Sequence, residues 1–202
     1  MHLRVIGLVL VGLLGGIAAA FLLMPETLQR FLPEKQTITI GKATVGGPFT
    51  LTDHTGKRVT DKDFRGKYML VFFGFTFCPD VCPTGLQVMT QAMEQLGPKA
   101  ERIQPIFISV DPERDTPEQL KMYVSSFHPS LIGLTGTAEE VEAAARAYRV
   151  YYRKVKDEKS SADYTVDHTS IIYLMDPKGE FVTHFTHATP ASAMAERLAK
   201  AL

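Results

Sequence analysis

The sequence has few cysteines and no surplus of either charge. Its 202 residues include only two cysteines, and Lys plus Arg equal Asp plus Glu at 22 each. A chain with equal numbers of positive and negative side chains has no overall electrostatic field that attracts nucleic acid, so we expect no nucleic-acid partner. A chain of this length can bury a core large enough to fold without disulfide staples. The sequence also lacks internal repeats and low-complexity tracts, and it therefore fits one domain of ordinary size with an appendage.

The N-terminal part of the chain almost lacks charge. Residues 5–24 contain no charged side chain, and a helix of that length rises about 30 Å, the thickness of the hydrocarbon core of a bilayer. A cleaved signal peptide is the alternative, since residues 18–20 are alanines, but a secretory apolar region usually has about 7–15 residues. We predict a transmembrane anchor or uncleaved signal at residues 1–24, a stalk or linker at 25–45, and one domain at 46–202.

The charges that flank the apolar run indicate its orientation. Arg4 and the α-amine precede the run, and the charges that follow it cancel, which favours a cytoplasmic N-terminus. We therefore expect a single-pass protein of the cytoplasmic (inner) membrane whose domain lies on the exported, periplasmic side. An exported cysteine pair is expected to oxidise unless something reduces it. A disulfide that closes so short a loop would add little stability, so a purely structural role for the pair is poorly motivated.

Residues 46–202 alternate between short apolar runs typical of buried strands and segments with helix-start signals. Alternating strand–helix units followed by an antiparallel pair imply a mixed sheet covered by helices. We predict an α/β, thioredoxin-like fold with a mixed central sheet flanked by helices and an N-terminal hairpin. The predicted elements are a hairpin at 49–59, strands at 68–74, 103–110 and 131–134, helices at 84–96, from 115 onward and at 137–148, a strand pair at 170–175 and 180–184, and a helix at 189–202.

Cys78 and Cys82 lie where the first long apolar strand passes into its helix. A spacing of four predicts neighbouring positions on one helical face. The unpaired N–H groups and the dipole at a helix N-terminus favour the thiolate, the form that binds metal and attacks disulfides. Pro79 and Pro83 follow the two cysteines and stiffen the loop. Two soft sulfurs suit Cu(I), and with an imidazole they also suit Cu(II). Two cysteines that are neighbours by chance are the alternative.

A third ligand has to come from elsewhere in the chain, and His168 precedes a late buried strand. In a thioredoxin-like topology, the loop before this strand lies beside the helix start that carries the cysteines. Asp167 adjoins the histidine, and a carboxylate there could orient the ring. A hydrogen-bonded loop histidine without a metal is the alternative for His168. From the residues alone, both interpretations stay open.

Several other polar or sulfur-bearing residues are assigned no chemistry. A spacing of three on a strand sends His184 and His187 to opposite faces, so we expect both at the surface. Methionines at helical spacing are typical of core packing, and a histidine in a turn is most simply solvated. The residues assigned to the core are Met89 and Met93, and those assigned to loops or charged turns are His54, Asp80, Asp111, Arg114 and Asp115.

Three separated stretches resemble motifs of the Sco/SenC family and follow one another in family order. They are FGFTFCPDVCP at 73–83, SVDPERDTP at 109–117, and VDHT at 166–169 followed by YLMDPKG at 173–179. The resemblance covers residues 46–202 and implies a thioredoxin-like fold with a copper site made of Cys78, Cys82 and His168. It also implies a part in building the dinuclear copper centre of cytochrome c oxidase, with Asp80 and the Asp111 loop as candidates for partner docking.

Three functions compete for these residues. The first is a copper metallochaperone that delivers copper to the copper-site subunit of cytochrome c oxidase, with other copper chaperones and thiol reductants as further partners. The second is a thiol–disulfide oxidoreductase that reduces the cysteines of that copper site, with Cys78 and Cys82 as its redox-active pair. The usual C-x-x-C redox spacing is one residue shorter than the spacing here. The third is a peroxidase of the peroxiredoxin type, which expects Thr or Ser where Phe75 stands. His168 is needed by the first function and is dispensable in the simplest form of the second.

Overall fold

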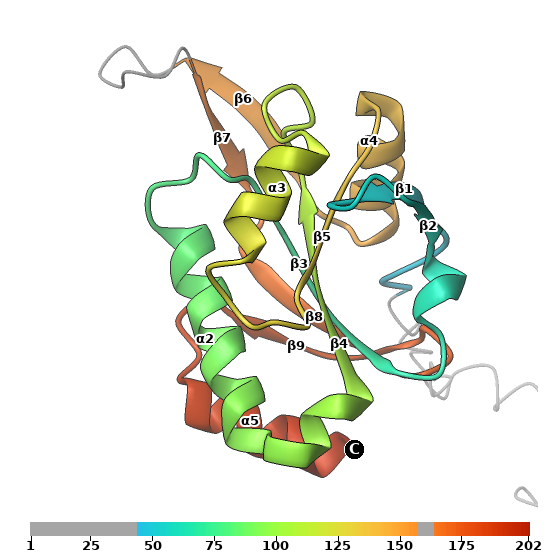
Figure 1. Ribbon diagram of the computed structural model, residues 1–202, viewed down its shortest axis with the longest axis vertical. Helices are drawn as coiled ribbons and strands as arrows, with labels where there is room; N and C mark the ends of the chain where they lie inside the picture. Colours follow the sequence, from blue (N-terminus) through green and yellow to red (C-terminus); the bar gives the residue numbers. More distant parts are fainter. Residues whose placement is uncertain (1–43, 157–163) are drawn as a thin grey trace, which may run out of the picture. The chain divides into compact units, whose positions relative to one another are not determined.

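The computed structural model describes residues 44–156 and 164–202 (Figure 1). The predicted anchor at residues 1–24 and all but the last two residues of the predicted stalk lie outside the described residues. Contacts between Cα atoms group Ala43–Leu202 into one compact unit. Within the part of the chain that the structure describes, no helix has the length and apolar character needed to cross a membrane.

A seven-stranded mixed sheet forms the centre of the domain. Its strands are β1 (Thr50–Asp53), β2 (Arg58–Thr60), β3 (Tyr68–Gly74), β4 (Ile103–Ser109), β5 (Ile132–Thr135), β8 (Ile171–Met175) and β9 (Phe181–Thr186). They lie in the order β2-β1-β5-β4-β3-β8-β9. The central strands β5, β4 and β3 are parallel, whereas β1 and β8 pair antiparallel with β5 and β3. The predicted mixed sheet with an N-terminal hairpin is therefore confirmed.

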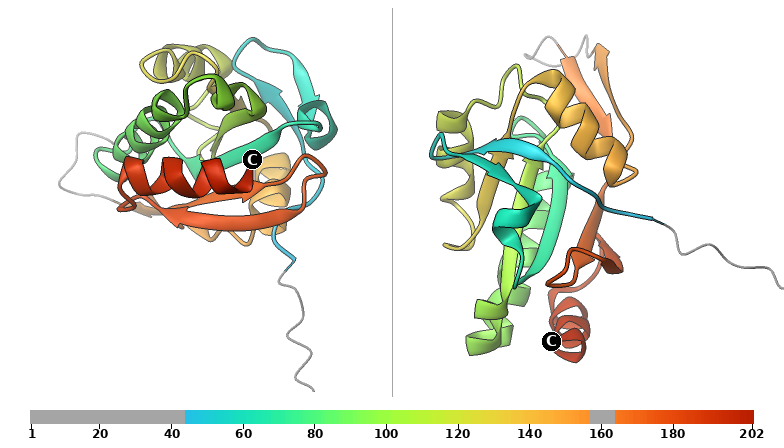
Figure 2. Two further views of the ribbon diagram at one scale, coloured as in Figure 1. Left: turned by 90° about the horizontal axis from the view of Figure 1, so that it is seen from below. Right: turned by 90° about the vertical axis from the view of Figure 1, so that its right-hand side faces the viewer.

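Helices cover both faces of this sheet. They are α2 (Val81–Leu96), α3 (Pro117–Val124), α4 (Ala138–Ala147) and α5 (Ala191–Ala201). Two neighbouring residues of β3 show that α2 and α4 cover opposite faces, because successive side chains of a strand point to opposite sides. Phe72 packs with Phe107 and its ring lies next to Gly85 of α2, whereas Phe73 packs against Tyr148 at the end of α4. The right-hand view of Figure 2 accordingly shows α3 and α4 on opposite sides of the sheet.

Side-chain caps fix where α3 and α4 begin. The Thr116 hydroxyl accepts a hydrogen bond from the Gln119 N–H, and Pro117 occupies the first turn, where its missing N–H costs nothing. Thr137 and Glu140 form a capping box at the start of α4. Both starts agree with the sequence prediction. Two short 3₁₀ segments that the sequence does not predict precede β3 and β4, namely η2 (Asp61–Phe64) and η3 (Gly97–Arg102).

A second sheet of two strands is also absent from the sequence prediction. Its strands β6 (Tyr152–Lys156) and β7 (Tyr164–His168) pair antiparallel. Their sequences, YRKVK and YTVDH, are too polar to look like buried strands, and Val166 is the one residue in them that is fully buried. In Figure 1 the hairpin lies at the same end of the molecule as the loop between β4 and α3. His168 is the last residue of β7. The prediction that it lies in a loop is therefore wrong.

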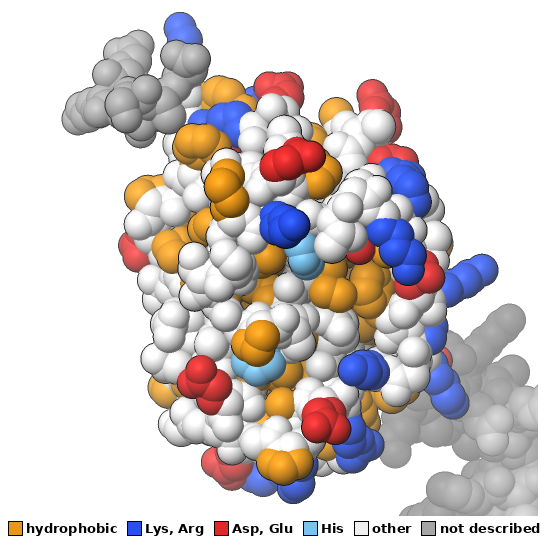
Figure 3. All heavy atoms as spheres, viewed as in Figure 1, with side chains coloured by type: hydrophobic (Ala, Val, Ile, Leu, Met, Phe, Trp, Pro, Cys, Tyr) orange, Lys and Arg blue, Asp and Glu red, His pale blue; other side chains and the backbone are white. Residues whose placement is uncertain are grey.

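The surface carries both charges and some apolar side chains. On the face seen in Figure 3, Lys and Arg side chains are interspersed with Asp and Glu side chains, in keeping with their equal numbers. Hydrophobic side chains gather in the upper left of that face, toward the end that carries β6 and β7. The large hydrophobic side chains that are exposed in the described residues are Phe77, Met122, Tyr151 and Val182.

Candidate metal centre

The connection from β3 to α2 carries both cysteines. Because α2 begins at Val81, three residues before the predicted start, Cys82 lies in its first turn, where it is fully buried. Cys78 lies in the loop before the helix and is half-buried. The prediction that the two share one helical face is therefore wrong. Instead, the Cys82 N–H donates to Cys78 Sγ at 3.4 Å. The Cys78 sulfur acts as the capping acceptor of α2, since Asp80 at the N-cap makes no side-chain cap bond.

The two sulfurs differ in their protonation. The pKa of Cys78 is lowered to about 4, mainly by a hydrogen bond from the Cys82 side chain and in smaller part by one from His168, whereas burial acts in the opposite direction. The same hydrogen bond, together with burial, raises the pKa of Cys82. These opposite shifts favour the thiolate at the half-buried Cys78 and the thiol at the fully buried Cys82. The thiolate is the form that binds soft metal ions and attacks disulfides.

His168 turns its imidazole toward these sulfurs. Its Nε2 lies 3.3 Å from Cys82 Sγ, and its Nδ1 lies 3.2 Å from the carbonyl oxygen of Thr169. When Nδ1 carries the proton and donates it to that carbonyl, Nε2 keeps a free lone pair for a metal ion. The ring also packs edge-on against Phe75, with 5.8 Å between the ring centroids. The histidine is thus oriented from both sides.

Asp167 does not orient the histidine, although it is its neighbour in sequence. Consecutive residues of a strand point to opposite sides. The Asp167 carboxylate is accordingly exposed, and it pairs with Arg153 at 3.2 Å. The carbonyl group of Thr169 takes the orienting position that was a candidate role for Asp167.

The structure brings the three predicted metal ligands together. The Sγ atoms of Cys78 and Cys82 and one ring nitrogen of His168 all lie within 4.8 Å of one another. Two sulfurs and one imidazole nitrogen form a donor set that is able to hold a soft metal ion. The wall of the site is tight, because a Cβ on Gly74 would lie only 2.6 Å from Cys82 Sγ. Of the two sulfurs, only that of Cys78 belongs to a residue that is partly exposed.

The residues expected to have no chemistry occupy varied positions. Met89 and Met93 are 2% and 1% exposed, so their assignment to the core is confirmed. His184 is exposed, as expected. His187 is only partly at the surface, since its Nδ1 is buried and has no hydrogen-bond partner among the described residues. None of these side chains belongs to the cluster of Cys78, Cys82 and His168.

Two predictions about loop residues need correction. His54 is not simply solvated, because its Nδ1 accepts a hydrogen bond from the Gly133 N–H at 3.1 Å and so ties the end of β1 to β5. Asp111 is fully buried and forms an ion pair with Arg114. Its carboxylate is therefore not available to a docking partner, whereas Asp80 is exposed beside the cysteines.

The SVDPERDTP stretch contains a buried polar network that the interpretation as a charged turn missed. Asp115 is fully buried and accepts hydrogen bonds from the Thr76 N–H at 3.0 Å, the Thr76 hydroxyl at 2.6 Å and the Ser109 hydroxyl at 2.6 Å. Burial raises the pKa of Asp115. Because Thr76 stands two residues before Cys78, the network ties the cysteine loop to the end of β4. The available signal was a polar run directly after a buried parallel strand, a position where α/β sheets place functional groups.

Known proteins are similar to this chain in sequence and in fold. A family model described as SCO1/SenC matches residues 38–202. The mitochondrial SCO1 homolog of Homo sapiens is 54% identical over 149 residues, which make up 72% of this chain and 49% of that protein. The chain thus spans about half the length of the first curated relatives that it matches.

Solved structures of Sco proteins are also similar to this chain. The copper-bound structure of Bradyrhizobium japonicum ScoI is 49% identical, with a TM-score of 0.72, and the match covers 78% of this chain and 99% of that chain. A structure of BsSco, reported with a disulfide switch and as a member of the Sco family of cytochrome c oxidase assembly proteins, is 29% identical with a TM-score of 0.59. That match covers 77% of this chain and 91% of the other. Homologous structures thus contain copper, and this chain gathers two cysteines and a histidine able to hold a metal ion. The chain belongs to the SCO1/SenC family.

Proposed function

We propose that this chain is a copper metallochaperone that binds copper through Cys78, Cys82 and His168 and delivers it to the dinuclear copper site of cytochrome c oxidase. The observation that carries the proposal is the approach of the three donor atoms to within 4.8 Å of one another. Copper in homologous structures supports the choice of metal. Since Cys78 is only half-buried, a cysteine of the target can approach from its side and take the ion by ligand exchange.

A titration with Cu(I) tests the three-ligand site. The full chain, fully reduced, competes with a chromogenic Cu(I) chelator, and we expect one copper per chain. His168→Ala is expected to bind copper at least about tenfold more weakly, with an unchanged circular dichroism spectrum. His184→Ala is the matched control, because it removes an exposed histidine outside the cluster. If His168→Ala bound Cu(I) as tightly as the wild type, the three-ligand site would be wrong.

The unequal cysteines favour a second candidate function, the reduction of the oxidase copper-site cysteines. The Cys78 thiolate is positioned to attack a disulfide of the target, and a mixed disulfide forms as one target sulfur leaves as a thiolate. Cys82, once deprotonated, then attacks Cys78 Sγ and releases the second target thiolate, so that two electrons pass from the pair to the target. The disulfide switch of BsSco supports a redox-active pair in this family.

Three measurements separate the metallochaperone from the reductase. A Cys78–Cys82 reduction potential too oxidising to reduce the target disulfide would exclude the reductase. A strain without the protein is expected to lose oxidase activity, and recovery on added copper would favour metal delivery. His168→Ala should abolish function in the strain if delivery is the main task, whereas a simple reductase would tolerate it.

The location and the further partners are also proposals. Residues 1–24 would anchor the chain in the cytoplasmic (inner) membrane and place the domain at 46–202 on the exported, periplasmic side. The uncharged run at residues 5–24 supports the anchor. Reporter fusions at the C-terminus, active only on the exported side, test the orientation. Copper chaperones that load the site and thiol reductants that keep it reduced are the expected further partners.

A further inference from the structure

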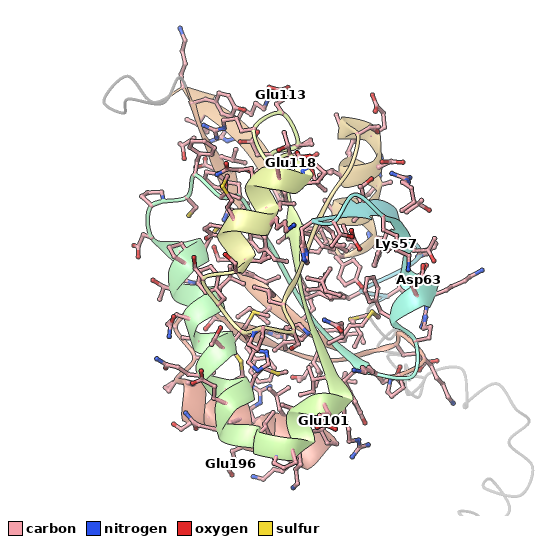
Figure 4. The ribbon with its side chains drawn as sticks, in the orientation of Figure 1. Lys57, Asp63, Glu101, Glu113, Glu118 and Glu196 are labelled. Carbon is pink, nitrogen blue, oxygen red and sulfur yellow. The ribbon has the colours of Figure 1, made fainter. Side chains whose placement is uncertain are left out.

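Arg114 contacts both segments of the chain that carry the metal-binding side chains. It lies in the loop between β4 and α3, a region that Glu113 and Glu118 mark in Figure 4. Its guanidinium carbon lies 3.8 Å from the centre of the Tyr164 ring, at the start of β7, and 4.7 Å from the centre of the Phe77 ring, in the cysteine loop. One planar cation thus packs on the strand that ends in the histidine and on the loop that contains Cys78.

Hydrogen bonds hold this guanidinium in a fixed orientation. Its Nη1 donates to the carbonyl oxygen of Tyr164 at 3.0 Å, and its Nε donates to the Asp111 carboxylate. The Tyr164 hydroxyl donates to the other oxygen of Asp111 at 2.7 Å. The Asp111 side chain is fully buried and that of Arg114 is 18% exposed. Nη2 has no hydrogen-bond partner in the part of the chain that the structure describes. Arg114, Asp111 and Tyr164 therefore form one hydrogen-bonded cluster, in which no side chain can move without breaking a contact with another.

The place of His168 depends on what holds its hairpin. β6 and β7 form a separate sheet that is not hydrogen-bonded to the main one, and an isolated two-stranded hairpin is only marginally stable. Because side chains alternate along a strand, Tyr164, Val166 and His168 share one face of β7. Val166 is buried on that face, and Tyr164 is fixed by Arg114. The contacts of Arg114 that fix Tyr164 therefore also set the position of His168.

We infer that Arg114 is a positioning residue for the metal site: it keeps His168 in reach of Cys78 and Cys82 by clamping β7 to the cysteine loop. Lysine keeps the charge but lacks the planar fork that stacks on rings and bonds at two points, so it cannot replace this arginine. The inference rests on the three-ligand site of the proposed function, since a residue that positions His168 matters only where His168 binds the metal.

Variants of the full, reduced chain test this role by Cu(I) titration. Arg114→Lys is expected to bind Cu(I) about tenfold more weakly than the wild type, as for other groups that orient a metal ligand. Tyr164→Leu removes the ring from β7 but leaves the Arg114–Asp111 pair, and the same loss is expected. In the background of His168→Ala, neither change should weaken binding further, because the group that they position is gone.

Arg197→Lys is the matched control. The Arg197 guanidinium lies 4.5 Å from the centre of the Phe185 ring and donates to Thr183, so it joins α5 to β9 by the same kind of contact. The Arg197→Lys variant should have a lower melting temperature, as Arg114→Lys does, but should bind Cu(I) as tightly as the wild type. Wild-type affinity in Arg114→Lys would overturn the inference, and so would an undiminished effect in the His168→Ala background. Equal affinity of the wild type and His168→Ala would instead overturn the three-ligand site itself.

Discussion

Gly74 ends β3 beside the buried sulfur, and its replacement by alanine tests whether the position of that sulfur controls metal binding. A Cβ at this position would lie 2.6 Å from Cys82 Sγ and 2.8 Å from Cε2 of Phe107. Non-bonded heavy atoms usually lie about 3.5–4.0 Å apart, so the sulfur and the ring would have to move by about 1 Å. The Cys82 side chain is short and lies in the first turn of α2, so it has little freedom to yield.

Gly74→Ala is expected to lower both the stability of the fold and the affinity for Cu(I). Overpacking of a core costs about 1–3 kcal/mol, and the lower chain entropy of alanine offsets about 0.5–1 kcal/mol of this. We expect a net loss of about 1–2 kcal/mol in the free energy of unfolding, measured with urea on the apoprotein. Metal sites hold their ligand distances to within about 0.2 Å. A sulfur displaced by several times that distance should therefore lower the Cu(I) affinity by about tenfold or more.

Gly133→Ala separates the effect on the sulfur from the effect on packing. Its Cβ would lie 3.0 Å from Cγ1 of Val124, so it also crowds a central strand, but it presses on α3 and not on a thiol. We expect this variant to lose stability and to keep wild-type affinity for Cu(I). If Gly74→Ala lost stability but bound Cu(I) as tightly as Gly133→Ala, the sulfur position would not control binding and the reasoning would be refuted.

Three further changes test the electrostatics and hydrogen bonds of the domain. Glu140→Gln removes an ion pair in which the side-chain hydrogen bond with Arg58 lowers the pKa of Glu140. The folded chain then binds this proton less tightly than the unfolded chain, so the pair stabilises the fold above about pH 4.3, and its contribution is lost as the pH falls through the folded pKa. We expect a slightly lower urea midpoint than the wild type at neutral pH and equal midpoints in acid. A difference that persisted in acid would contradict the assignment. Ser109→Ala removes a donor from the buried Asp115 carboxylate, and urea unfolding should show a loss of about 2 kcal/mol. Thr135→Val removes a buried hydroxyl that has no hydrogen-bond partner among residues 44–156 and 164–202, so stability should stay the same or rise by up to about 1 kcal/mol. A loss as large as that of Ser109→Ala would show that this hydroxyl is bonded after all.

Local patterns predicted the elements whose signals are local. The apolar run that forms β3 and the cap residues Thr116 and Thr137 each lie within a few residues of the boundary that they indicate. Burial of a continuous strand and capping of a helix are short-range effects, so a single sequence reports them. The hairpin of β6 and β7 lacks such a signal, because its polar strands are held through contacts with the distant Asp111 loop.

The candidate site divides in the same way. That two cysteines stand at the start of a helix is visible in the sequence, since spacing and neighbours decide it. Only the tertiary structure decides that Cys82 is fully buried and Cys78 half-buried, that His168 reaches across 86 positions to the Cys82 sulfur, and that Arg114 contacts both segments. Burial and long-range contacts arise when distant segments pack against one another, and no local pattern of residues encodes which segments will meet.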